Sequence, residues 1–337
     1  MGRVRSAQQL IRPLAVVSAL AIVACAPRPP APSGPKPVPL HLEPACDLAP
    51  AAGVEWVVEV KPRAIAEVPD LIPAIGLVLP EERLQVFAAA HGGIDLRQTK
   101  DLCVAQYKDS SLAIVSVPLD PDRVAQAFAA RTAEPPVRTI LAPNPLVLRL
   151  AGRVQDDNER LTLFGRDAAA LERGTTGPLR AAEAFAFMKL KKATPALRGA
   201  ALSRASEVVR DAPVRAFAAG PFEGEVARGL GGILRATTAV GAAVKWTGQG
   251  TALDVRIALV GAWGDDGPAA AQRLAAAANV LADSAIGRLL GLDQPIRSPT
   301  ARAENDALVL EATLDGAALA RGLHAALDAE IADIMRR

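Results

Sequence analysis

Three histidines are the side chains most suited to acid–base catalysis or metal binding in this chain, and their spacing favours neither role. His41, His91 and His324 lie far apart, and none belongs to an H-E-x-x-H motif or stands beside a cysteine at zinc-site spacing. The sequence also lacks the G-x-S-x-G turn of a hydrolase nucleophile and the P-loop that holds phosphate. We therefore expect no enzymatic activity, no cofactor and no metal. The alternative is an active site assembled in a cleft from distant polar groups.

The run Gly229-Leu230-Gly231-Gly232 is the remaining local motif that could contact a ligand. Glycine exposes backbone that another molecule can approach closely. The run fails the spacing of a dinucleotide-binding fingerprint and does not follow a clear strand. We interpret it as a mobile loop or a tight packing site, and we keep Gly229, Gly231 and Gly232 as candidate ligand-binding residues.

Charge and composition argue against several kinds of partner. The 38 basic and 36 acidic residues give a formal net charge of +2, so we expect no nucleic-acid partner. Aromatic residues make up 3% of the chain, which is low for the stacking platforms that bind sugars or single-stranded nucleic acid. Lys189, Lys191 and Lys192 form a basic cluster that could contact anionic lipid or an acidic partner, although such clusters are usually solvated faces.

The N-terminus carries a targeting pattern. Arg3, Arg5 and Arg12 precede an apolar run of 11 residues, Leu14–Ala24, which is too short to span a bilayer but suits a signal peptide. The run ends in Ile22-Val23-Ala24-Cys25 and resembles the signal peptide and lipobox of a bacterial lipoprotein precursor. The resemblance covers residues 1–25 and implies a signal peptide at 1–24 and lipidation of Cys25. An ordinary secretory signal is the alternative.

The same resemblance implies how the protein is held. Residues 25–45 would form a lipidated cysteine and a proline-rich tether, because residues 26–39 contain seven prolines and proline favours an extended chain. Alanine rather than aspartate follows Cys25, which by the lipoprotein sorting rule implies the outer membrane, facing the periplasm. The expected membrane partner is therefore the bilayer that receives the N-terminal lipid.

Two cysteines remain once Cys25 is assigned to lipidation. Cys46 and Cys103 form an even pair in an exported protein, which favours a disulfide between them. A reactive thiol pair is the alternative, but no C-x-x-C motif occurs.

Strand-like runs followed by an aspartate and an alanine-rich segment recur along the rest of the chain. An aspartate there can accept hydrogen bonds from the free N–H groups of a first helical turn. We interpret these residues as helix caps rather than catalytic carboxylates. They are Asp120, Asp167, Asp265 with Asp266, and Asp315, before helices expected at 123–128, towards 171, from 268 and at the C-terminus.

Each unit also has a second strand-like run upstream, across a polar turn, which predicts β-hairpins. Apolar and polar residues alternate between Leu253 and Leu259 and between Val54 and Lys61, as in strands with one buried and one solvated face. We therefore predict an α+β fold of repeated β-hairpin–helix units, with antiparallel sheets that helices cover on one face.

The repeated units occur in two pairs, which predicts two similar halves. We place an N-terminal α+β half at residues 46–185 and a C-terminal α+β half at 186–337. A helical stretch over residues 178–210, interrupted near Thr194-Pro195, would link them. A single continuous sheet is the main alternative.

Two functions remain. The first is a lipid-anchored, non-enzymatic binding or scaffold module of the cell envelope, with an envelope protein as its partner. The alternative is a periplasmic carrier or binder of an apolar, lipid-like ligand held between the sheet and its helices. A large apolar cavity between sheet and helices would favour the carrier, and a densely packed core would count against it.

Overall fold

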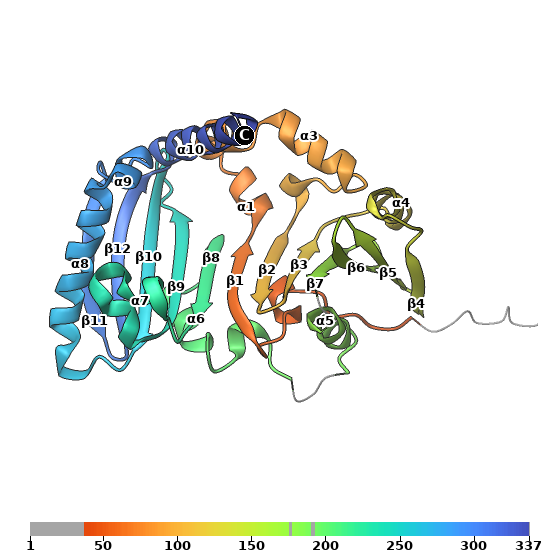
Figure 1. Ribbon diagram of the computed structural model, residues 1–337, viewed down its shortest axis with the longest axis horizontal. Helices are drawn as coiled ribbons and strands as arrows, with labels where there is room; N and C mark the ends of the chain where they lie inside the picture. Colours follow the sequence, from red (N-terminus) through yellow and green to blue (C-terminus); the bar gives the residue numbers. More distant parts are fainter. Residues whose placement is uncertain (1–36, 175–176, 190–192, 337) are drawn as a thin grey trace, which may run out of the picture. The chain divides into compact units, whose positions relative to one another are not determined.

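One antiparallel sheet of twelve strands forms the centre of the fold (Figure 1). The computed structural model describes residues 37–174, 177–189 and 193–336, so the predicted signal peptide and Cys25 lie outside the described residues. Across the sheet, the strands are β11 (Arg297–Glu304), β12 (Ala307–Asp315), β10 (Ala252–Gly261), β9 (Thr237–Trp246), β8 (Val214–Ala219), β1 (Val54–Val60), β2 (Asp101–Tyr107), β3 (Ser110–Ser116), β7 (Ala168–Gly174), β6 (Asp157–Phe164), β5 (Leu146–Val154) and β4 (Val137–Pro143). The predicted antiparallel α+β class is confirmed, and the strands join in one continuous sheet.

Ten α-helices accompany the sheet in the described part of the chain. They are α1 (Pro62–Ala66), α2 (Ile72–Val78), α3 (Glu81–Ala90), α4 (Pro121–Arg131), α5 (Pro178–Ala186), α6 (Ser203–Val209), α7 (Gly224–Arg228), α8 (Gly267–Asp283), α9 (Ala285–Leu289) and α10 (Gly316–Arg336). Short 3-10 helices include η2 (Ala45–Leu48), η4 (Leu96–Gln98), η6 (Gly229–Ala236) and η7 (Gly264–Asp266). Among the described residues, no helix has both the length and the apolar character needed to cross a bilayer.

Helices cover both faces of the sheet, so the prediction of a single covered face is wrong. On β12, Ala307 and Val309 belong to the core that contains residues of α5 and α6. Their neighbours Leu308 and Leu310 point to the opposite face and belong to the core under α8. Residues that follow one another in a strand face opposite sides, so β12 is buried on both.

Charged residues on the strands explain why the alternation of apolar and polar residues predicted one solvated face of the sheet. Arg256 on β10 has a side chain only 14% exposed, because its Nε donates to the Val208 carbonyl of α6 at 2.9 Å and its guanidinium pairs with Glu311. On β1, Glu59 is buried and accepts a hydrogen bond from Arg215 Nε at 2.9 Å. Because their charges are paired, Arg256 and Glu59 can be buried on the face that alternation assigns to solvent.

The segment after Asp167 is a strand rather than the predicted helix. Residues Ala168–Gly174 form β7, which pairs with β3 on one side and β6 on the other. Ala168 and Ala170 are completely buried there. Pairing along both edges outweighs the helix propensity of the alanine-rich run.

The aspartate caps are confirmed in part. Asp120 accepts a hydrogen bond from the Asp122 N–H at 3.0 Å at the start of α4, and Asp315 accepts one from Ala317 N–H at 2.9 Å at the start of α10. Asp266 precedes α8 but makes no side-chain capping bond, since it lies with Asp265 in η7, which leads directly into the helix. The cap predictions at Asp167, Asp265 and Asp266 are therefore wrong.

The end of the predicted tether belongs to the folded unit. Val38 N–H donates to the Asn144 carbonyl at 2.8 Å, and His41 N–H donates to the Ala186 carbonyl at 2.9 Å. The extended segment that the sequence assigns to the tether as far as residue 45 therefore contacts the fold from residue 38 onward. Bonds to turns and helices far along the chain anchor it there.

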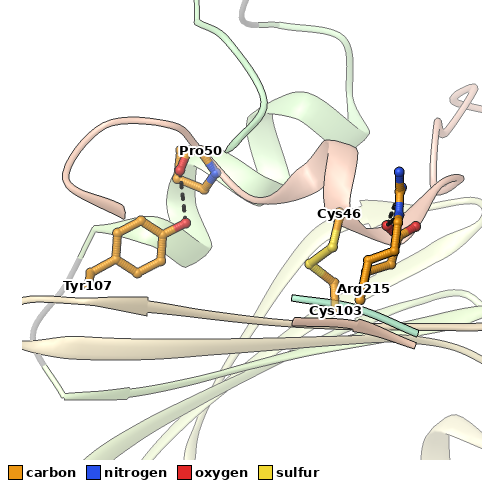
Figure 2. The surroundings of a disulfide bond; sticks show 6 residues. Cys46, Pro50, Cys103, Tyr107 and Arg215 are labelled. Atoms are coloured by element: carbon orange, nitrogen blue, oxygen red, sulfur yellow. Dashed lines mark hydrogen bonds and ion pairs between the residues drawn. A yellow bond between two sulfur atoms is a disulfide. The ribbon is translucent and has the colours of Figure 1, made fainter. Parts of the chain in front are cut away.

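The predicted disulfide between Cys46 and Cys103 is present and joins η2 to the central strand β2 (Figure 2). Their Cα atoms are 5.2 Å apart, and both residues are buried. One turn further along this segment, the Pro50 carbonyl accepts a hydrogen bond from the Tyr107 hydroxyl at 2.9 Å. Burial raises the pKa of Tyr107, and the negative charge of Glu172 raises it further. The segment that contains Cys46 and Pro50 is thus bonded to β2 at two residues, Cys103 and Tyr107.

Candidate functional site

An apolar cavity lies between one face of the sheet and helices α1, α2 and α10. This cavity, which we call the main cavity, has a volume of about 500 Å³. Its floor comes from the apolar side chains of five strands, and its walls come from the three helices and η4. The sheet contributes Val60, Leu102, Val214, Val244 and Leu253. The helices contribute Ile65 from α1, Leu71 just before α2, Ala74 and Ile75 from α2, and Leu319, Ala320 and Leu323 from α10.

The sequence builds this cavity from alternating strands and short apolar helices. On β10, Leu253 faces the cavity while its neighbour Asp254 bonds to Thr313 on the other side, as strand alternation requires. The start of α10 approaches the β9–β10 turn closely, since a Cβ at Gly316 would lie 2.7 Å from the Thr251 carbonyl oxygen. This close approach fixes the start of α10 against the sheet, and α10 also packs against α2. The two contacts hold both helices above the sheet.

The chemistry of the main cavity suits an apolar ligand. Of the residues that line it, Arg97 alone carries a charge, and the Trp246 indole N–H already donates to the Gly250 carbonyl at 2.8 Å. Ordered water needs two to four polar partners, which this lining does not offer. Leu79 and Leu323 line the cavity and are 44% and 38% exposed, so the opening to the surface is apolar as well. A mostly apolar pocket of this size is typical of a small-molecule site.

A smaller cavity of about 310 Å³ lies on the same face of the sheet beneath α3 and α4. Its lining is also mainly apolar and includes Phe87, Val115, Phe128 and Leu161. His91 reaches it from the end of α3, where its ring stacks on Phe87 with centroids 4.1 Å apart. The predicted end of a helix at His91 is confirmed.

The charged clefts near α1 are polar but internally paired. One of about 690 Å³ is lined by Glu59, Lys61, Asp101 and Arg215, among others. Burial raises the pKa of Asp101, and the nearby charge of Glu59 raises it further. Lys61 Nζ pairs with Asp211 at 2.8 Å. Arg215 pairs with Glu59, so most of these charges face an opposite charge. Among the described residues, no group of three or more His, Cys, Asp or Glu is placed to hold a metal.

The glycine run identified in the sequence does not line the main cavity. It forms η6, in which Leu230, Gly231 and Gly232 all have positive φ, and a Cβ on either of those glycines would meet no atom within 4 Å. Gly231 and Gly232 therefore adopt a left-handed backbone conformation that glycine allows, and a side chain at either position would point into open space. Nearby, Ile233 packs into the core under α8. A ligand-binding role of Gly229, Gly231 and Gly232 stays a prediction.

The other predicted functional residues are separate from this cavity. Lys189 lies over the Phe187 ring at 4.5 Å, while Lys191 and Lys192 are outside the described residues, as is Cys25. The residues that form the main cavity were not singled out by the sequence, because they are ordinary apolar side chains scattered between positions 60 and 323. The alternation at Leu253 and the apolar segment around Ile75 are the signals that mark part of it.

No protein-family model matches the chain, and no curated protein matches it. Among solved structures, the chain is similar to one described as crystal form III of TP0453, with 9% sequence identity and a TM-score of 0.49. The similarity covers 85% of this chain and 99% of that chain. At this identity and TM-score, it carries no conclusion about function.

Proposed function

We propose that this protein is a non-enzymatic, lipid-anchored binding protein of the bacterial cell envelope that holds an apolar, lipid-like ligand in the main cavity. The observation that carries the proposal is a cavity of about 500 Å³ between sheet and helices with one charged residue in its lining. A dense core at this place would instead favour a scaffold without a ligand. Transfer of apolar surface from water into such a cavity is favourable by about 25 cal/mol per Å².

The N-terminal segment supports the location in this proposal. The lipobox-like Ile22-Val23-Ala24-Cys25 and the proline-rich residues after it fit a lipid anchor with an extended tether. On this proposal Cys25 is lipidated and the folded unit faces the periplasm from the outer membrane. The disulfide between Cys46 and Cys103 is in keeping with an oxidising compartment.

We also infer that the two halves of the chain are related repeats. In the first, β1 is followed by the hairpin β2–β3, helix α4 and a last strand, β7, that pairs with β3. In the second, β8 is followed by the hairpin β9–β10, helix α8 and a last strand, β12, that pairs with β10. The first half has three further strands, β4 to β6, between α4 and β7, and the second half has one, β11, between α8 and β12. The order that the halves share supports a repeat over residues 46–185 and 186–337. If the halves are repeats, β1, β2, β3 and β7 should superpose on β8, β9, β10 and β12, and failure of this superposition would contradict the inference.

Native mass spectrometry of the full chain, released from membranes in mild detergent, tests the ligand. We expect one apolar molecule bound per chain, together with the mass of an N-terminal lipid on Cys25. Ala320→Phe should lower ligand occupancy, because Ala320 is buried on α10 and lines the cavity, which can accept the ring. Ala325→Phe is the matched control, since Ala325 is exposed on the same helix and does not line the cavity.

The result separates the two functions. A wild-type chain with no bound apolar molecule, or equal occupancy in the two Phe variants, would contradict the ligand-binding proposal. A chain that keeps the Cys25 lipid but carries no ligand would fit the scaffold function. An unmodified Cys25 on a full-length chain would contradict the anchor.

A further inference from the structure

The main cavity and the smaller cavity meet at a shared wall. Leu96 of η4 and Leu102 of β2 line both of them. Leu102 is on the floor, since it belongs to the sheet, and Leu96 lies above the sheet between the two spaces. The two cavities thus lie side by side on one face of the sheet, separated by these two leucine side chains.

From this arrangement we propose that the ligand is a lipid with two hydrocarbon chains, one in each cavity, that join beside Leu96. This inference rests on the proposed function and names the class of ligand. Each cavity is within or near the range of about 300–1,000 Å³ usual for a ligand site. One lipid whose two chains diverge at a single point can fill both cavities.

A cation lies where the two chains would join. Arg97 follows Leu96 directly, lines the main cavity and also lines an adjoining polar cleft of about 560 Å³. Its Nε and Nη2 pair with Asp95 at 3.0 Å and 3.1 Å and its Nη1 with Glu81 at 2.7 Å, and the side chain is 47% exposed. These bonds use three of the five guanidinium N–H groups, so the second N–H of Nη1 and of Nη2 can donate to an anionic group. In a two-chain phospholipid the phosphate is attached close to the point from which the chains diverge, which matches Arg97 beside Leu96.

The charged residues of the smaller cavity do not offer a rival headgroup site. Arg131 Nη2 lies 3.2 Å from the buried carboxylate of Glu159, and the Arg131 guanidinium lies over Phe128. His91 Nδ1 is 2.9 Å from the Phe87 carbonyl oxygen. The Arg131 Nε is buried without a hydrogen-bond partner, but Arg131 and His91 line only the smaller cavity and not the main one, so neither lies at the junction. The other residues of this lining are apolar and suit a hydrocarbon chain.

Two probes that differ in chain number test the inference: a diacyl phosphatidylglycerol and its lyso form, which has the same headgroup and one chain. The delipidated full chain in detergent is titrated with each probe, and native mass spectrometry measures the bound fraction. We expect Leu96→Trp, which fills the junction, to weaken diacyl binding by about ten-fold or more, because part of one chain loses its apolar surroundings. Lyso binding should stay within about two-fold, since the main cavity is kept.

Matched variants guard against a general loss of folding. Leu96→Ala widens the junction and should keep diacyl binding. Ala127→Trp fills the smaller cavity from α4 and should again lower diacyl binding alone, whereas Ala129→Trp, on the exposed side of the same helix, should change neither probe. Arg97→Gln should weaken phosphatidylglycerol more than an uncharged diacylglycerol.

The outcomes are distinct. Equal binding of the diacyl probe by wild type, Leu96→Trp and Ala127→Trp would overturn the two-chain inference, as would wild-type binding of the lyso form alone, while lipid binding itself would stand. Absence of binding of either probe to the wild-type chain would instead remove the proposed function.

Discussion

The Asp315 carboxylate accepts a hydrogen bond from the Thr251 hydroxyl at 2.5 Å and another from the Ala317 N–H at 2.9 Å. It thereby ties the β9–β10 turn to the first turn of α10, the helix that carries Leu319, Ala320 and Leu323 into the main cavity. A cap at the end of β12 thus helps to position one wall of the candidate site.

Removal of this cap should loosen the wall. Asp315→Ala is expected to lower the free energy of unfolding by about 1 kcal/mol, the usual cost of a lost N-terminal cap, and to lower ligand occupancy. Asp315→Asn should keep most of both, because asparagine caps about as well. Chemical denaturation and native mass spectrometry measure the two effects. Equal stability of the alanine variant and wild type would contradict the role of the cap.

The stability that Asp315 contributes to the fold should decrease in acid. The hydrogen bond from Thr251 is the main cause that lowers the pKa of Asp315 below its ordinary value of 3.8. A lowered pKa in the folded state means that its contribution to stability is present above pH 3.8 and is lost as the pH falls through the folded value. The stability difference between wild type and Asp315→Ala should therefore shrink in acid.

The disulfide gives a second prediction. Cys46 and Cys103 are 57 residues apart in sequence, and the loop that they close contains α1 and α2, which wall the main cavity. Replacement of both cysteines by alanine should lower the free energy of unfolding by roughly 4 kcal/mol in the chain-entropy model. Ligand occupancy should fall only as far as the chain unfolds, because Cys103 and the cavity residue Leu102 are neighbours in β2 and face opposite sides of the sheet.

Thiol labelling checks the bond directly. In the exported, unreduced chain, Cys46 and Cys103 should resist alkylation until a reductant is added. Cys25→Ser serves as the control, since Cys25 is not part of the bond and its loss should leave this pattern unchanged. Two cysteines that react without reductant would contradict the disulfide.

Local patterns predicted the hairpins well. The turn of β5–β6 has Gln155 at φ 53° and that of β11–β12 has Asn305 at φ 51°, so short polar bends between apolar runs marked real reversals of the chain. No strand is expected from the sequence at Val214–Ala219, yet β8 lies at the centre of the sheet between β1 and β9. Its short, alanine-rich run carries little strand signal, and pairing on both sides decides its conformation.

The cavity was beyond the reach of sequence patterns for a different reason. An empty space depends on the distance between elements, and Leu71, Leu253 and Ala320 meet around it from three distant parts of the chain. Periodicity assigns each of them to an apolar face without indicating whether that face is fully packed. The sequence could therefore offer a space between sheet and helices only as an alternative.

Asp101 should weaken the fold at neutral pH. Burial is the main cause that raises its pKa, followed by the charge of Glu59, while Lys100 and Lys61 lower it in part. A raised pKa in the folded state means that stability is greatest below the ordinary value of 3.8 and is lost as the pH rises through the folded value. Asp101→Asn should therefore unfold at higher denaturant concentration than wild type near pH 7, and this gain should vanish below pH 3.8.

Asp211 offers a control with the opposite sign. Its pKa is lowered, chiefly by the hydrogen bond from Lys61 at 2.8 Å. Asp211→Asn should lose a small amount of stability near pH 7, within the 0–1 kcal/mol usual for an exposed pair, and the loss should disappear in acid. Destabilisation by both substitutions near pH 7 would contradict the sign given for Asp101.

Trp246 should report directly on ligand in the main cavity. It lines that cavity, whereas Trp56 and Trp263 do not, and Trp263 is buried under α8. A lipid with brominated chains should quench tryptophan fluorescence as it binds, because bromine quenches an indole on contact. Trp246→Phe should remove most of this quenching while native mass spectrometry still detects bound lipid, and Trp263→Phe should keep it. Quenching that survives Trp246→Phe but is lost with Trp263→Phe would place the ligand beneath α8, and the main cavity would no longer be the binding site.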